Sequence, residues 1–281
     1  GYAVENASWE RAKKFDIGVD LNLFDQVSIT FDYFHDRRDR ILQKRGSWPV
    51  IMGYAHATPW SNIGKVDNKG FELSVNWKKE IIKDMFVDLR GNFTYTQNKY
   101  VYNDEPDYPY VWQTKTGKPL SCTYGYIADG LFEDEDDIRN SPSQKNLGST
   151  VMPGDIKYRD VNGDGAITTE DQVMLSRYGG IPRIQYGFGL NWTYKNIDFG
   201  VFFNGSAQRT LMIDNIAPFC SDVGNQDRNL MKFIADNYWS EASPNPEAAY
   251  PRLGVNNSQV ANNMKPSSFW MRNGNFLRFK T

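Results

Sequence analysis

The sequence predicts an all-β fold, an antiparallel transmembrane β-barrel fragment of about seven strands with long extracellular loops that contain short helices. Three observations predict this fold class. Apolar and polar residues alternate along three pairs of adjacent segments. The turn inside each pair is very short, whereas the connections between pairs are long. Outer-membrane barrels keep short turns on one rim and long loops on the other, so the asymmetry favours a barrel over a soluble β-sandwich.

The alternation locates the strands. In the first pair, Ile17, Val19 and Leu21 alternate with polar residues, and a turn follows at residues 25–26. The predicted strand pairs lie near residues 12–38, 64–97 and 183–208, with a last strand from residue 269. The predicted long loops lie near residues 41–63, 97–183 and 208–269, with short helices at residues 133–139 and 228–239.

The second pair shows how such a sheet would meet a membrane. Phe71, Leu73, Val75 and Trp77 alternate with polar residues, and we expect these four side chains to face lipid. Seven strands are too few to close a membrane barrel, and lipid tolerates no open sheet edge. We therefore expect the chain to be a fragment of a larger barrel.

Composition excludes several classes of protein. The net charge of -2 provides no strong field that would attract nucleic acid. No run approaches 18 apolar residues, which excludes a transmembrane helix but leaves barrel strands open. His35 and His56 lie far apart without a partner cysteine, and no nucleophile-elbow, zinc-protease or phosphate-loop motif is present, so we expect no enzyme. Cys122 and Cys220 could pair or stay free.

The segment DVNGDGAITTED has the oxygen-ligand spacing of a calcium loop. Its ligand positions one, three, five, seven and twelve are Asp160, Asn162, Asp164, the carbonyl of Ala166, and Asp171. Gly165 provides the sharp turn at position six. Because several carboxylates would otherwise repel one another, the spacing predicts a structural Ca²⁺ site. The alternative is a turn rich in Gly, Asn and Asp that holds no metal.

The flanks of this loop differ from those of an EF-hand. Residues 155–159 alternate polar and apolar side chains, which predicts a short entering strand instead of a helix. Thr168 can cap an exiting helix that would run through Leu175 and end before Gly179.

Aromatic residues in two predicted loops are candidates for cargo binding, because aromatic faces suit the apolar faces of sugar rings and peptide side chains. These residues are Trp48, Tyr54 and Trp60 in the first loop, and Tyr108, Tyr110 and Trp112 in the second. Loop packing, contact with a lid and an interfacial aromatic girdle are the alternative roles for each of them.

Several motifs in one order resemble a known family. They are FDIGVDLNLF with ITFDYFHDRRDRIL, then NIGKVDNKGFELSVNW, PGDIKYRDVNGDGAITTED, IPRIQYGFGLNWTYKNIDFGVFFNGS, YPRLGVNN and FWMRNGNFLRFKT. Together they resemble the C-terminal part of the β-barrel of SusC/RagA-like TonB-dependent outer-membrane transporters of the Bacteroidetes type. The resemblance spans essentially the whole chain, residues 1–281, and implies a partial barrel without the N-terminal plug domain.

The resemblance also implies a function and a location. The expected activity is active import of a bulky nutrient, an oligosaccharide or a peptide, across the outer membrane of a Gram-negative bacterium. The expected partners are outer-membrane lipid, a SusD-like surface lipoprotein and, through the absent N-terminal part, the TonB complex.

Other functions remain open at this point. A soluble, calcium-stabilised β-sandwich that binds carbohydrate is the first alternative, and the DVNGDG segment also resembles half of a dockerin module. Dockerins carry two such repeats, whereas this chain carries one. A glycosidase would need two facing carboxylates, and no acidic pair stands out. A passive porin would share the barrel.

Overall fold

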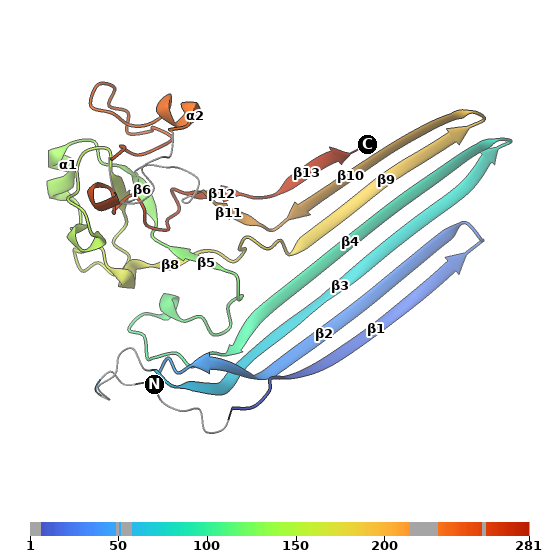
Figure 1. Cartoon of the computed structure of the whole chain (residues 1–281), viewed down its shortest axis with the longest axis horizontal. Coiled ribbons are helices and arrows are strands. Elements are labelled where there is room, and N and C mark those ends of the chain that lie inside the picture. The colour runs from blue at the N-terminus through green and yellow to red at the C-terminus, as the bar shows by residue number, and fades with distance from the viewer. Residues whose placement is uncertain (1–6, 49–50, 52–57, 214–229, 255–256, 281) are drawn as a thin grey trace.

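A computed structural model describes residues 7–48, 51, 58–213, 230–254 and 257–280. Its main element is an antiparallel seven-stranded sheet (Figure 1), with strand order β1-β2-β3-β4-β9-β10-β13. The strands are β1 (Arg11–Leu23), β2 (Val27–Lys44), β3 (Trp60–Ile82), β4 (Met85–Tyr102), β9 (Ile184–Tyr194), β10 (Ile197–Ala207) and β13 (Phe276–Lys280). The predicted fold class is confirmed.

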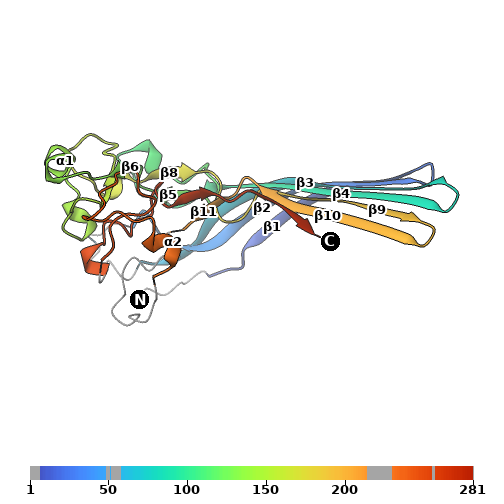
Figure 2. The same ribbon diagram turned by 90° about the horizontal axis from the view of Figure 1, so that it is seen from above.

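The long connections gather at one end of this sheet, opposite the three short hairpin turns (Figures 1 and 2). They contain three two-stranded sheets, β5-β8, β6-β7 and β11-β12. The strands are β5 (Thr123–Gly125), β6 (Ala128–Leu131), β7 (Ile156–Tyr158), β8 (Val173–Ser176), β11 (Thr210–Met212) and β12 (Met271–Asn273). The helices are α1 (Glu135–Asn140) and α2 (Lys232–Ala235), with 3-10 turns η2 (Val111–Gln113), η3 (Lys145–Leu147), η4 (Thr169–Asp171) and η5 (Asn257–Gln259). In the described ranges, no helix has the length and apolar character needed to cross a membrane.

Strand register gives the main sheet one apolar and one polar face. Residues paired across strands share a face, and Phe31 pairs with Leu73, which pairs with Phe93. The row continues through Tyr186 on β9. Stacked rings strengthen this face, as at Phe71 and Phe93, whose centroids lie 5.7 Å apart. The opposite face carries the intervening polar residues.

The apolar face has the height of a bilayer core. The row of Met85 and Ile82 marks its lower limit, and the row of Tyr95 and Phe71 its upper limit. Ten residues separate Met85 from Tyr95, which at about 3.4 Å per residue spans about 34 Å along the strand. With a strand tilt of about 40°, the height along the membrane normal is about 26 Å, close to the apolar band of an outer-membrane barrel.

Nothing in the described chain covers this apolar face, and the sheet forms a single layer (Figure 2). Apolar side chains on β1, β9 and β10 remain open to the surroundings; Phe199, for example, is 55% exposed. The buried hydrophobic residues of the described ranges all lie between Tyr126 and Trp270, outside the main sheet. The soluble β-sandwich alternative is therefore not favoured, because it requires a second sheet on this face.

Several aromatic residues depart from the alternation; Phe34, Phe86 and Phe202, for example, pair across strands with Asp16, Glu80 and Gly189 of the polar face. Phe202 lies on the polar face of β10, where the guanidinium of Arg90 is 5.2 Å from its ring centroid. Glycine is required at positions 187 and 189, because a Cβ at either would come within 3.0 Å of the Phe202 ring. The polar face thus contains a local aromatic and cationic contact.

Two helix predictions are wrong in extent. The exiting helix predicted from Thr168 through Leu175 consists of the single turn η4, and Val173–Ser176 forms β8, which pairs with β5. Tertiary pairing overrides the weak helical signal here. The helix predicted at residues 228–239 reduces to α2, with residues 228–229 outside the described ranges. Backbone contacts with Tyr250 take residues 237–239 out of the helix.

Other local predictions are confirmed. The short helix at residues 133–139 appears as α1, capped by the Asp134 side chain. The entering strand at residues 155–159 appears as β7. The strand predicted from residue 269 divides into β12, which pairs with β11, and β13, which joins the main sheet.

The two faces of the main sheet predict losses of stability of different size when a charged side chain is introduced. We expect Val75→Arg, at the middle of the apolar face, to destabilise the protein in lipid by about 2–4 kcal/mol because a cation would enter hydrocarbon. Ser74→Arg, one residue away on the polar face, should cost far less. Urea unfolding of the full-length gene product in bilayers measures both. Equal losses would contradict the assignment of faces.

Candidate functional site

The loop end of the molecule contains a hydrophobic core of its own, built from two long connections. Tyr126 and Tyr158 come from the first, and Trp239 and Trp270 from the second. The rings of Tyr126 and Tyr158 lie 5.1 Å apart. The two connections therefore fold together into one body, which we call the loop body, at one end of the barrel strands.

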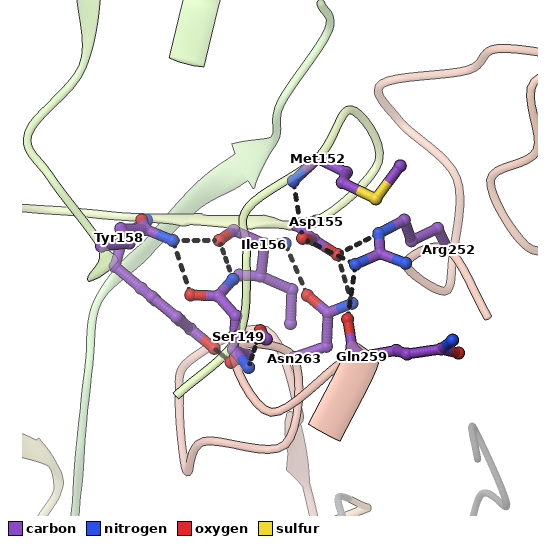
Figure 3. Close-up of polar contacts among 10 residues, drawn as sticks. Ser149, Met152, Asp155, Ile156, Tyr158, Arg252, Gln259 and Asn263 are labelled. Carbon is purple, nitrogen blue, oxygen red and sulfur yellow. Dashed lines mark hydrogen bonds and ion pairs between the residues drawn. The ribbon is translucent and has the colours of Figure 1, made fainter. Parts of the chain in front are cut away.

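A buried ion pair joins the two connections (Figure 3). Asp155 is fully buried, and its Oδ1 lies 2.7 Å from the Nε of Arg252. Nη2 of Arg252 donates to Oδ2 at 3.2 Å, the Met152 backbone nitrogen donates to Oδ2 at 2.9 Å, and the Asn263 amide donates to Oδ1 at 2.8 Å. Burial raises the pKa of the Asp155 carboxyl, and the Arg252 guanidinium opposes this shift.

A second buried network surrounds β7. The Gln144 amide donates to the Ile156 carbonyl at 3.0 Å and to Asn262 Oδ1 at 2.7 Å, and its own oxygen accepts from the Tyr158 backbone nitrogen at 2.6 Å. The Tyr158 hydroxyl donates to the Asn262 carbonyl at 2.8 Å. Because buried polar groups are costly unless paired, these bonds specify one arrangement of the two connections.

The calcium-like loop is closed by its own hydrogen bonds. Asp160 accepts from the backbone nitrogens of Gly163 at 2.6 Å and Gly165 at 2.8 Å. Asp171 is fully buried and accepts from the backbone nitrogens of Val161 and Thr168, both at 2.8 Å. Both glycines have positive φ angles, 78° and 84°. The loop thus folds around carboxylates that receive backbone donors.

The chemistry of this loop fits a hard cation, since its donors are carboxylate, amide and carbonyl oxygens. The positions of the predicted ligand atoms are less specific for a cation than their chemistry, because several of these groups bond to one another. Asn162 donates to Asp164 at 3.0 Å, and the Ala166 nitrogen donates to Asp164 at 2.8 Å. Within the described residues, no three acidic, histidine or cysteine side chains converge as metal ligands. Calcium binding therefore stays a prediction.

The structure brings two of the six predicted aromatic residues together. Tyr110 and Trp112 stack with ring centroids 4.5 Å apart and planes inclined by 9°. The indole nitrogen of Trp112 donates to the carbonyl of Glu170 at 2.8 Å, which joins this pair to the calcium-like loop. The flat pair is therefore held beside that loop.

The structure describes three of the other four predicted aromatic residues. Trp60 begins β3, where the Lys44 ammonium is 5.7 Å from its ring centroid. Trp48 is half-buried, Tyr108 is exposed, and Tyr54 lies outside the described residues, as does His56. Among the described residues, Tyr110 and Trp112 are thus the two of the six predicted residues for which the structure shows a ring-to-ring contact within the predicted set.

Sequence reasoning missed the cations beside the stacked pair. Lys118 donates to the Trp112 carbonyl at 2.6 Å, and its ammonium lies 5.3 Å from the Tyr124 ring centroid. The Lys115 ammonium is 5.9 Å from the same ring. Burial lowers the pKa of Lys118. We call Tyr110, Trp112, Lys115, Lys118 and Tyr124 the aromatic–cation cluster.

A thiol lies next to this cluster. Cys122 is free, and burial raises the pKa of its thiol, which makes it a weak nucleophile. Cys220 lies outside the described residues.

Comparison with known proteins defines the class. The model of the family described as "TonB dependent receptor-like, beta-barrel" matches residues 1–240. The chain is similar to TonB-dependent receptor P3 of Formosa agariphila, with 25% identity over 99% of this chain and 27% of that protein. It is also similar to TonB-dependent receptor SusC of Bacteroides thetaiotaomicron, with 24% identity over 98% of this chain and 26% of that protein.

Solved structures agree with this match. The structure of the RagAB peptide transporter superposes with a TM-score of 0.63 at 18% identity, over all of this chain and 30% of that one. The chain belongs to the TonB-dependent receptor-like β-barrel family, and the predicted SusC/RagA-like character is confirmed. It spans about a quarter of the length of the curated relatives it matches.

The buried ion pair predicts a large loss of stability on truncation. We expect Arg252→Ala to destabilise the loop body by about 3–5 kcal/mol, because it leaves Asp155 buried without its cation. Arg139→Ala removes an exposed partner of Asp136 and should cost less than about 1 kcal/mol. Pulse proteolysis of the loop body measures both variants, and similar losses would contradict the role of the buried pair.

Proposed function

We propose that this chain forms part of an outer-membrane, TonB-dependent transporter that imports a bulky nutrient. The main support for the proposal is that the chain combines a sheet suited to a membrane with a folded loop body. A single-layer sheet presents an apolar face of bilayer height, and a folded loop body lies at one end of its strands. A barrel provides the passage, and a packed loop body at its mouth provides a surface for cargo.

The proposed cargo is an oligosaccharide or a peptide, and the aromatic–cation cluster is its proposed contact. The aromatic faces of Tyr110 and Tyr124 suit sugar rings and apolar peptide side chains. The ammonium groups of Lys115 and Lys118 suit carboxylates, which both an acidic sugar and a peptide C-terminus carry. RagAB, which has a similar structure, is a peptide transporter, and this supports a peptide as one of the two proposed cargoes.

The proposed partners are a SusD-like surface lipoprotein over the mouth and the TonB complex as the energy source. Similarity to SusC and to the RagAB structure supports both. The loop body offers an apolar surface for a lid near α2, where Leu230, Met231 and Phe233 are exposed.

Import can be tested by deletion of the gene and complementation. We expect the deletion strain to lose growth on one polymeric nutrient, either glycan fragments or peptides, and the full-length gene to restore it. A protonophore should stop uptake of the labelled nutrient, because TonB energy depends on the inner-membrane gradient. Uptake that survives the protonophore would indicate a passive porin and contradict the proposal.

Two variants test the cargo contact. We expect Tyr110→Ala with Trp112→Ala to reduce uptake by about tenfold at low nutrient concentration, since each lost stacking contact is worth about 0.5–1.5 kcal/mol. Trp9→Ala with Phe24→Ala removes two exposed aromatic residues elsewhere and should leave uptake unchanged. Unchanged uptake in the first variant would exclude the cluster as the contact.

We propose in addition that the DVNGDG loop binds Ca²⁺ for stability. The ligand spacing and the oxygen donors support this proposal. Calcium should raise the Tm of the wild type by several degrees relative to chelator, because a ligand bound to the folded state stabilises it. Asp160→Ala with Asp164→Ala should abolish that increment, while Asp107→Ala with Asp198→Ala should preserve it. A wild-type melting curve that chelator does not change would refute the site.

A further inference from the structure

A band of cations crosses the apolar face of the sheet at its loop end. Strand register places Lys13 opposite Arg37, Arg37 opposite Asp67, and Asp67 opposite Lys99. Lys65 and Lys69 lie two residues to either side of Asp67 along β3, on the same face. We call Lys13, Arg37, Lys65, Lys69 and Lys99 the outward cationic belt.

The belt continues the face that meets lipid. The uppermost apolar row contains Ile17, Tyr33, Phe71 and Tyr95. Lys69 lies two residues beyond this row, and the other belt residues lie four to six residues beyond it. At about 3.4 Å per residue and a tilt of about 40°, the belt begins about 5 Å above the hydrocarbon and extends to about 16 Å. That interval is the headgroup region of a bilayer.

The charges of the belt are mostly unneutralised. All five cations are exposed, and Lys13, Lys65, Lys69 and Lys99 form no salt bridge within the described residues. Two carboxylates share the region. Asp39 pairs with Arg11 at 2.7 Å.

The second carboxylate, Asp67, contacts His35 and Arg37. Its Oδ1 lies 2.6 Å from Nε2 of His35 and 3.4 Å from Nε of Arg37. A depression of about 390 Å³ lies over the strands here. Its charged lining residues are Lys13, Arg37, Arg38, Lys65 and Lys99, with the carboxylates Asp39 and Asp67. The region therefore combines a concave surface with an excess of positive charge.

We propose that the outward cationic belt binds the phosphate groups of a phosphorylated glycolipid in the outer leaflet. Charge complementarity, the lipid-facing side of the sheet and the headgroup height all favour this occupant. Long lysine side chains can extend along the surface while their ammonium groups reach phosphates. A soluble cargo would approach from the polar face or the loop body instead. This inference rests on the membrane orientation of the proposed function, with the apolar face in lipid. It does not require that the protein imports a nutrient.

The test compares lipid A that carries its phosphates with the same lipid after their enzymatic removal. The full-length gene product is purified in detergent, and binding of each lipid is measured by native mass spectrometry. We expect the wild type to prefer the phosphorylated form by about tenfold or more. A triple variant should reduce that preference to about twofold or less, because the phosphates lose their cations. It combines Lys13→Gln, Lys65→Gln and Lys99→Gln.

A matched triple variant provides the control. It changes the net charge by the same amount as the belt variant and combines Lys83→Gln, Lys145→Gln and Lys232→Gln. These exposed lysines lie outside the belt. This variant should retain the full preference. Each belt substitution is also measured alone, so that a folding defect in the triple variant does not decide the outcome.

Three results would overturn the inference. They are equal binding of the two lipid forms by the wild type, a full preference in the belt variant, and complete displacement of the lipid by millimolar inorganic phosphate, which would indicate a site for free phosphate. Uptake by the belt variant is scored separately. A lost lipid preference with normal uptake, or the reverse, therefore separates this inference from the proposed import function.

Discussion

Pairing of every backbone group between neighbouring strands is the constraint on which this molecule depends, because hydrocarbon offers no other partner for them. Pairing fixes a register, and a register with period two assigns each side chain to lipid or to the interior. The hairpin turns set that register with left-handed residues, Asp25, Asp84 and Lys195, at φ angles of 54°, 65° and 53°. A slip by one residue would exchange the two faces completely, so the turns and the alternation must agree.

The loop body is stabilised differently, by a hydrophobic core of its own. Its two connections lie far apart in sequence, and hydrophobic contact alone would leave their mutual position loosely determined. The buried pair of Asp155 and Arg252 and the amide of Gln144 make that position specific. Gly154 contributes by its positive φ of 83° and by leaving room for the Trp239 ring, which a Cβ would overlap.

The sequence could predict whatever depends on local periodicity. The three hairpins, α1 and β7 follow from alternation or capping within a few residues of each other. The strand conformation of Val173–Ser176 could not be predicted, because its partner strand β5 lies about fifty residues earlier in the sequence. The same holds for the site. Tyr110 and Trp112 were identifiable as aromatic residues, but the hydrogen bond from Trp112 to Glu170 and the approach of Lys115 to Tyr124 depend on tertiary folding.

Strand β4 connects the two surfaces to which we assign binding. Its upper end presents Lys99 to the outward belt. One residue further, the Tyr100 nitrogen donates to the carbonyl of Lys118, a residue of the aromatic–cation cluster, at 3.0 Å. The Tyr100 carbonyl accepts from the nitrogen of Gly117, next to Lys118 in sequence, at 2.8 Å. Adjacent residues of a strand point to opposite faces. Lys99 thus contributes its side chain to the belt, and Tyr100 contributes its backbone to the cluster. A headgroup bound at the belt would therefore restrict the strand to which the cluster is bonded.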